Sequence, residues 1–145
     1  MTTAPAPHQN ARPDDHNKIR RLGEDYLAAE EAKDLPGLLG LLTDDVIFLM
    51  PAAAPLRGKA AVESLYRTFF GQFTSRHAAT VEEIVVAGDW AFAWGEESLK
   101  LTAASGQSAE MRGKGMSILR RQADGSWKFA RGINNLQPVP TAASR

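Results

Sequence analysis

The chain has 145 residues, of which 43% are hydrophobic and 23% are charged. A single domain of this length buries roughly two thirds of the surface of its unfolded chain. The 17 basic and 17 acidic side chains cancel, and such a neutral protein is a poor candidate for general binding to nucleic acid or to an anionic membrane. The absence of cysteine excludes disulfides, thiol catalysis and cysteine-ligated metals.

The two ends of the chain have the composition of disordered segments. Residues 1–13, MTTAPAPHQNARP, lack the basic and apolar regions of a signal peptide, and their Pro, Ala and Thr content favours disorder. Residues 138–145 are interpreted in the same way. No apolar run approaches the ~20 residues of a membrane span. We therefore expect one folded domain over residues 14–137, in a cytoplasmic protein.

The first half of the chain has helical periodicity, with apolar residues three and four positions apart. Asp14 or Asp15 can cap a first helix, and Asp34 can cap a short second one. A third helix is predicted after Gly58. The expected buried positions are Ile19, Leu22, Tyr26 and Ala29, then Leu35, Leu38, Leu39 and Leu42, then Val62, Leu65, Tyr66, Phe69 and Phe73.

Between the second and third helices, Val46–Met50 is an uninterrupted apolar run that ends at Pro51. It is too short for a helix and indicates a strand covered on both faces.

From residue 76 the apolar period approaches two, which is typical of strands. Three turn signals separate four long strand candidates, and they are Gly88-Asp89, Ser105-Gly106 and Asp124-Gly125. The candidates cover residues 76–87, 90–102, 108–121 and 126–135. Short loops join antiparallel neighbours, so the order of elements predicts an α+β domain with helices packed on one face of a curved antiparallel sheet.

Four segments of the chain resemble the NTF2-like superfamily, and together they cover residues 16–136. The opening of SnoaL-like and ketosteroid-isomerase-like proteins is similar to EDYLAAEEAKDLPGLLGLLTDDVIFLMP, and their third helix is similar to LRGKAAVESLYRTFF. The sheet of the DUF4440 branch resembles AGDWAFAWGEE and LRRQADGSWKFARGINN. The resemblance implies a cone-shaped fold with an apolar pocket for a small organic ligand, no cofactor, and a homodimer formed through the outer face of the sheet.

The resemblance also implies roles for single residues. Tyr26 matches the tyrosine that donates a hydrogen bond to the developing enolate in the isomerases. Ser117 stands where the isomerases have a protonated aspartate, and its hydroxyl is a weaker donor. Met50 stands where they have the catalytic aspartate base, and a thioether cannot accept a proton. Steroid-type isomerisation by that mechanism is therefore not expected.

Three further polar groups fall at positions that border the pocket in relatives. Glu96 would be a carboxylate in an apolar cone, where burial raises a carboxyl pKa and suits it to general acid–base catalysis. His77 would be a second acid–base group, and Asn134 would orient a carbonyl or hydroxyl. A one-residue error in strand phase would place Glu97 inside and Glu96 in solvent.

The predicted catalytic set is therefore Tyr26, Glu96 and His77. The predicted pocket-lining set is Phe48, Met50, Phe69, Trp94, Ser98, Ser117, Leu119 and Asn134. No metal site is expected, because the chain has no cysteine and its carboxylates are scattered.

Two functions fit these residues. One is a cofactor-independent enzyme that isomerises, cyclises, dehydrates or hydrolyses a small apolar substrate by moving protons. The other is a non-catalytic ligand-binding or dimerisation domain, which the methionine at position 50 favours.

Overall fold

The computed structural model describes residues 12–140. Within that range the chain forms α1 (Asp15–Glu31), α2 (Leu35–Leu39), β1 (Leu42–Leu49), β2 (Leu56–Arg57), α3 (Lys59–Gln72), β3 (Phe73–Ala79), β4 (Glu83–Ala87), β5 (Trp90–Ala103), β6 (Ser108–Arg121), β7 (Trp127–Asn134) and β8 (Gln137–Pro138). The helices come first and most of the strands follow, as the change of periodicity predicts.

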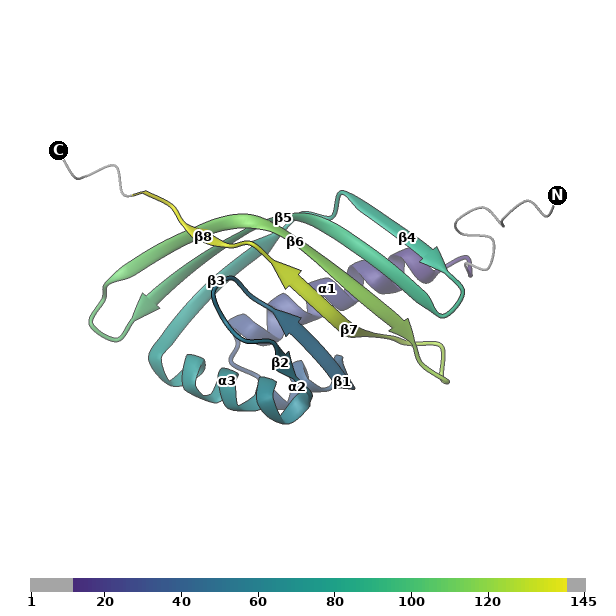
Figure 1. Cartoon of the computed structure of the whole chain (residues 1–145), viewed down its shortest axis with the longest axis horizontal. Helices are drawn as coiled ribbons and strands as arrows, with labels where there is room; N and C mark the ends of the chain where they lie inside the picture. Colours follow the sequence, from purple (N-terminus) through teal and green to yellow (C-terminus); the bar gives the residue numbers. More distant parts are fainter. Residues whose placement is uncertain (1–11, 141–145) are drawn as a thin grey trace.

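The strands form one sheet in the order β2-β1-β7-β6-β5-β3, with β4 added on β5 and β8 on β6. The strands after α3 pair antiparallel, whereas β1 lies parallel to β7. The 14-residue strands β5 and β6 arch over the helices, and α1 crosses beneath them (Figure 1). The sheet is therefore mixed and strongly curved, and its concave face is the one that the helices cover.

The single strand predicted over residues 76–87 is in fact two strands, β3 and β4. The extended segment is interrupted at Thr80. The Thr80 amide donates to the carbonyl of Glu96, and β5 changes its partner here from β3 to β4. Gly95 of β5 lies against the backbone at this interruption, and a Cβ on Gly95 would stand 1.9 Å from the Thr80 carbonyl oxygen. A glycine is required at this point because the two backbones approach so closely.

Strand β1 begins earlier than predicted and is less covered. It includes Thr43, Asp44 and Asp45, and its pairing with β7 is irregular in this part. Leu49 is 41% exposed, so the expectation of a strand buried on both faces is wrong at this end. Here β1 meets the short hairpin strand β2 instead of a second packed layer.

The predicted helix stripes form two adjoining core clusters. The first joins α1 to β4, β5, β6 and β7, and its buried members are Ile19, Leu22, Ile84, Val86, Ala91, Leu119 and Trp127. The second joins α2, α3 and β1 through Leu38, Leu42, Val46 and Val62, with Tyr26 packed against it. Asp34 caps α2 as predicted, since its side chain accepts a hydrogen bond from the amide of Gly37 at 3.0 Å.

The start of α1 is held by a buried ion pair. The Asp15 carboxylate accepts two hydrogen bonds from the Arg121 guanidinium, at 2.5 and 2.9 Å, and one from the Trp127 indole at 3.1 Å. Burial raises the pKa of Asp15, but the hydrogen bonds and charge of Arg121, the Arg12 amide and the Trp127 indole outweigh it and lower the pKa to about 2. Asp15 is thus an anchor to β6 and β7, while Asp14 takes the N-cap position without a side-chain hydrogen bond.

The two predicted disordered segments lie largely outside the described residues, which leave out 1–11 and 141–145. At the C-terminal end, Pro138 belongs to β8 and pairs with Met111 of β6.

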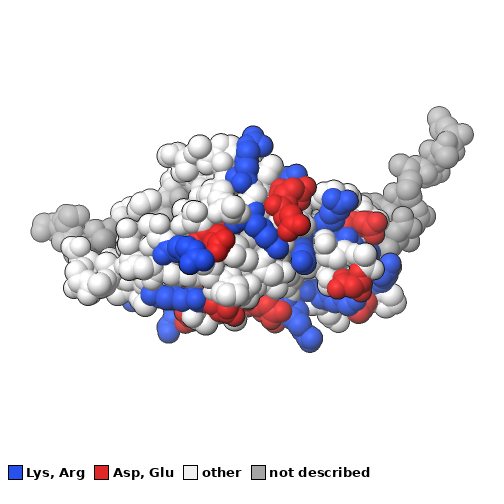
Figure 2. Space-filling view, turned by 90° about the horizontal axis from the view of Figure 1, so that it is seen from below, with Lys and Arg blue, Asp and Glu red and all other residues white. Residues whose placement is uncertain are grey.

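No helix in residues 12–140 combines the length and the apolar character needed to cross a membrane. On the face shown in Figure 2, Lys and Arg side chains are interspersed with Asp and Glu, and neither sign forms a continuous patch.

Replacing Asp15 by asparagine should lower the free energy of unfolding by about 3–5 kcal/mol, because the buried Arg121 charge would keep only the exposed carboxylate of Asp89, at 3.3 Å, as an ionic partner. The matched control is Asp14→Asn, whose 3.3 Å pair with Lys18 is exposed and should contribute under about 1 kcal/mol. Urea unfolding at fixed protein concentration, followed by tryptophan fluorescence, measures both. Equal losses in the two variants would show that the buried pair is not an anchor.

Candidate functional site

A cavity of about 380 Å³ lies between α1, α3 and the concave face of the sheet. Most of its wall is apolar, and one end holds a cluster of interacting polar side chains. Tyr26, Glu30, Tyr66, His77 and Glu97 make up this polar end, which brings together α1, α3, β3 and β5.

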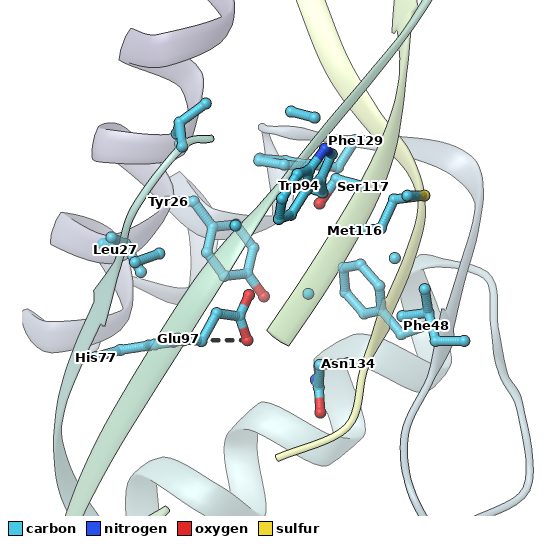
Figure 3. A pocket seen from close by; sticks show the side chains of 18 of the residues that line it. Tyr26, Leu27, Phe48, His77, Trp94, Glu97, Met116, Ser117, Phe129 and Asn134 are labelled. Atoms are coloured by element: carbon cyan, nitrogen blue, oxygen red, sulfur yellow. Dashed lines mark ion pairs between the residues drawn. The ribbon is translucent and has the colours of Figure 1, made fainter. Parts of the chain in front are cut away.

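The imidazole of His77 lies between two carboxylates. Its Nδ1 is 3.1 Å from Oε1 of Glu30, and its Nε2 is 3.7 Å from Oε2 of Glu97. The side chain of Glu30 is only 5% exposed, whereas that of Glu97 is 22% exposed and lines the cavity (Figure 3). Glu30 is therefore the internal partner of His77, and Glu97 is the carboxylate that a ligand can reach.

These contacts keep His77 charged. Burial lowers the pKa of His77, but the hydrogen bond to Glu30 and the negative charges of Glu30 and Glu97 outweigh burial and raise the pKa to about 9. His77 is consequently an imidazolium at neutral pH.

Two tyrosines continue the hydrogen-bond chain on the other side of Glu30. The Tyr66 hydroxyl donates to Oε2 of Glu30 at 2.9 Å, and the hydroxyls of Tyr26 and Tyr66 are 2.5 Å apart. Burial, with the nearby negative charge of Glu30, raises the pKa of both tyrosines well above the ordinary value. Both hydroxyls therefore stay protonated over the physiological range, and each has one proton to donate.

The structure corrects the strand phase that sequence reasoning used for β5. Glu96 is exposed on the outer face, and its neighbour Glu97 points into the concave side. The concave face of β5 carries Ala91, Ala93, Gly95, Glu97 and Leu99. The sequence does indicate which face is solvated. Lys100 is four residues after Glu96 and so lies on the same face of the strand, and two charged side chains on one face indicate exposure to solvent.

Glycine at position 115 makes room for Glu97. A Cβ on Gly115 would stand 2.4 Å from Oε1 and 2.8 Å from Cδ of Glu97. Gly115 lies on β6, two residues beyond Gly113, which is directly opposite Glu97 on β5. A side chain at position 115 would therefore push the Glu97 carboxylate away from its present place beside His77.

Most of the predicted pocket residues lie on the wall of the cavity, and these are Phe48, Met50, Trp94, Ser117, Leu119 and Asn134, together with Tyr26 and His77. Two do not. Ser98 follows the misassigned phase of Glu96, and Phe69 packs among Tyr66, Phe70 and Phe73 one helical turn beyond Leu65, which does line the cavity. Trp94 reaches the cavity although it is 37% exposed, and its indole donates to Glu83 on β4.

Sequence reasoning did not identify Glu30 and Tyr66 as site residues. Glu30 lies four residues after Tyr26, so a longer helical stripe would have placed both on one face. Tyr66 was expected in the core, where its hydroxyl needs a hydrogen-bond partner. That its partner is Glu30, 36 residues away, is a fact of the tertiary structure.

In the part of the chain from residue 12 to residue 140, no group of three or more His, Asp or Glu side chains is arranged to hold a metal ion. The site that the structure presents is an acid–base network at the end of an apolar cavity.

Comparison with known proteins identifies the fold. Residues 24–130 match the model of the SnoaL-like domain family. A conserved protein from Planctomyces limnophilus is 33% identical, covers 88% of this chain and 100% of its own, and superposes with a TM-score of 0.84. Among curated proteins, none matches this chain.

Two further crystal structures are similar at lower identity. An NTF2-like protein with a cystatin-like fold from Novosphingobium aromaticivorans is 24% identical over 91% of this chain and 87% of its own, with a TM-score of 0.73. A LinA-type3 hexachlorocyclohexane dehydrochlorinase from Novosphingobium barchaimii is 19% identical over 88% and 90%, with a TM-score of 0.76. The matches confirm the predicted NTF2-like, SnoaL-like fold, whereas the likeness to the DUF4440 branch stays a prediction.

The charged state of His77 predicts how stability depends on pH. The folded protein keeps this proton up to about pH 9, whereas the unfolded chain releases it near 6.5. The contribution of His77 to stability is thus complete below pH 6.5 and is lost as the pH rises toward 9, by up to about 3 kcal/mol.

Urea unfolding of the wild type and of His77→Gln at intervals from pH 6 to pH 9 measures this contribution. The difference in unfolding free energy between the two proteins should shrink steadily across this range. A difference that stays constant with pH would mean that His77 is not held as a cation by Glu30 and Glu97.

Proposed function

Because this chain belongs to the SnoaL-like domain family, we propose that it is a cofactor-independent enzyme that moves protons on a small, largely apolar molecule. The observation that carries the proposal is the Glu97 carboxylate, which faces an apolar cavity and is backed by the His77 imidazolium. A carboxylate that water solvates poorly is a competent base for a carbon-bound proton.

Glu97 is the proposed base, and His77 the residue that positions it. In this scheme Glu97 removes a proton from the substrate, while the His77 imidazolium balances the charge of the carboxylate before the reaction. Glu30 in turn holds His77 by accepting a hydrogen bond from Nδ1. The carboxylate–histidine–carboxylate arrangement supplies the base that Met50 does not.

The reaction class consistent with this base is proton abstraction followed by isomerisation, cyclisation or elimination. One similar structure is a dehydrochlorinase by name, and a dehydrochlorination is an elimination. The identity to that protein is too low to transfer its substrate, so the support is for the type of chemistry alone.

A second candidate is a non-catalytic ligand-binding domain. Met50 favours it, because the wall of the cavity is apolar at the position where the isomerases carry their base. The two candidates differ in whether removing the Glu97 charge changes a rate or only an affinity.

We also propose that the protein forms a homodimer through the outer face of the sheet. Trp90 and Ile118 are 43% and 40% exposed, and such large apolar side chains are costly to leave in water. Sedimentation at tens of micromolar protein should give the mass of a dimer, and Ile118→Lys should shift it toward the monomer. A wild-type monomer would contradict this expectation.

Base activity can be tested without the natural substrate. 5-Nitrobenzisoxazole opens when a base removes its proton at carbon 3, and the product absorbs in the visible range. The wild type should accelerate this reaction, and Glu97→Gln should reduce the acceleration by about 10²–10⁴-fold, which is the usual contribution of a positioned base.

The matched control is Glu96→Gln, which changes the adjacent glutamate on the opposite face of β5 and should leave the rate within a factor of two. Equal rates in Glu97→Gln and the wild type would remove Glu97 as the base. Ligand binding by a protein that does not accelerate the probe would favour the non-catalytic alternative.

A further inference from the structure

The hydrogen bonds at the polar end of the cavity have a fixed direction, set by Glu30. Each oxygen of this carboxylate accepts one bond: Oε1 from Nδ1 of His77 and Oε2 from the hydroxyl of Tyr66. A hydroxyl has one proton, and Tyr66 donates its proton to Glu30. In the 2.5 Å contact between the two tyrosines, Tyr66 must therefore accept and Tyr26 must donate.

This direction decides what Tyr26 can offer a ligand. The Tyr26 proton is already donated to Tyr66, so the side of the oxygen that faces the cavity carries lone pairs. In Figure 3 the Tyr26 hydroxyl and the Glu97 carboxylate point toward one another, and the carboxylate can only accept as well. The polar end of the cavity thus presents two hydrogen-bond acceptors side by side.

The charges lead to the same conclusion. Glu30, His77 and Glu97 together carry one net negative charge, so an anionic ligand would be repelled at this end. A full cation gains less here than at an isolated carboxylate, because the His77 imidazolium is 3.7 Å from Glu97. A neutral donor group satisfies both acceptors without the cost of removing a charge from water.

We propose that the ligand of this cavity is an apolar molecule that carries a hydroxyl group, and that this hydroxyl donates a hydrogen bond to Tyr26 or Glu97. The proposal rests on the proposed function, since it assumes that the cavity binds a small molecule. It reverses the role that the resemblance implied for Tyr26, which was to donate to a developing oxyanion.

A further polar residue of the wall is compatible with such a ligand: Asn134 on β7, which pairs with Gly115 of β6. Asn134 uses its amide oxygen to accept a hydrogen bond from the Leu136 amide at 3.2 Å, which leaves its NH₂ group as the donor that lines the cavity. A ligand acceptor, where present, would therefore lie toward Asn134, and the hydroxyl would lie toward Tyr26 and Glu97. Much of the remaining wall is apolar and includes Phe48, Leu119 and Phe129.

The test compares two probes that differ by two hydrogen atoms. The alcohol 1-(2-naphthyl)ethanol can donate a hydrogen bond, and the ketone 2-acetylnaphthalene can only accept one. The alcohol should bind about tenfold or more tightly in a calorimetric titration, as expected for a hydrogen bond to a charged group. The anion 2-naphthoate should bind more weakly than either.

Tyr66→Phe tests the direction of the hydrogen bonds that run from Tyr26 through Tyr66 to Glu30. Without the Tyr66 hydroxyl, the Tyr26 proton is released from Tyr66 and can turn to Glu97 or to the ligand. In both cases the cavity presents fewer free acceptors, so the preference for the alcohol should fall by at least threefold. Unchanged affinity for 2-ethylnaphthalene, which makes no hydrogen bond, shows that the cavity keeps its shape in this variant. Glu96→Gln is the control that should leave the preference as it is in the wild type.

Two outcomes contradict the inference, and they are distinguishable from failure of the proposed function. Tighter binding of the ketone or of 2-naphthoate overturns the proposed donor preference while leaving the small-molecule cavity intact. An alcohol preference that persists undiminished in Tyr66→Phe overturns the role of the hydroxyl chain. Failure of all the probes to bind would overturn the cavity function and the inference together.

Discussion

The ion pair between Asp15 and Arg121 is the constraint on which the rest of the structure depends. It fixes the first turn of α1 against β6 and β7 through a carboxylate with no exposed surface. Glu30 lies fifteen residues further along the same helix, about 22 Å at 1.5 Å per residue. Because the start of α1 is fixed, its last turn is held at the height of His77 on β3. The helix is thus tied to the sheet by buried charges at both ends.

The second of these attachments is also the functional end of the cavity. A buried carboxylate and a buried imidazole each lose hydration on folding, and they offset that loss by bonding to one another. The network of polar contacts continues beyond this pair. Tyr66 and Tyr26 extend it on the side of Glu30, and Glu97 extends it on the side of His77. Structural and chemical roles therefore share the same hydrogen bonds. This explains how the site can have a defined polarity without a metal ligand set in the described residues.

Much of the fold could be predicted from local pattern. The helical stripes, the Asp34 cap and the three turns follow from spacing and from the special conformations of a few residues. The strand phase at Glu96 and Glu97 is harder to predict, because two adjacent glutamates give no preference for either face and only Lys100, on the same face as Glu96, indicates which face is solvated. Trp94 shares a face with Glu96 and lies at the rim of the cavity, where its indole donates to Glu83.

By itself, the sequence determined the order of helices and strands, and it places at position 50 a methionine, whose thioether cannot accept a proton. These depend on residues close together in the chain, where periodicity and turn chemistry act directly. Only the tertiary structure decided that Glu30, Tyr66, His77 and Glu97 form one network, because their partners are between 20 and 47 residues apart. Contacts over that separation depend on the curvature of the sheet and the position of α1, and no local pattern encodes them.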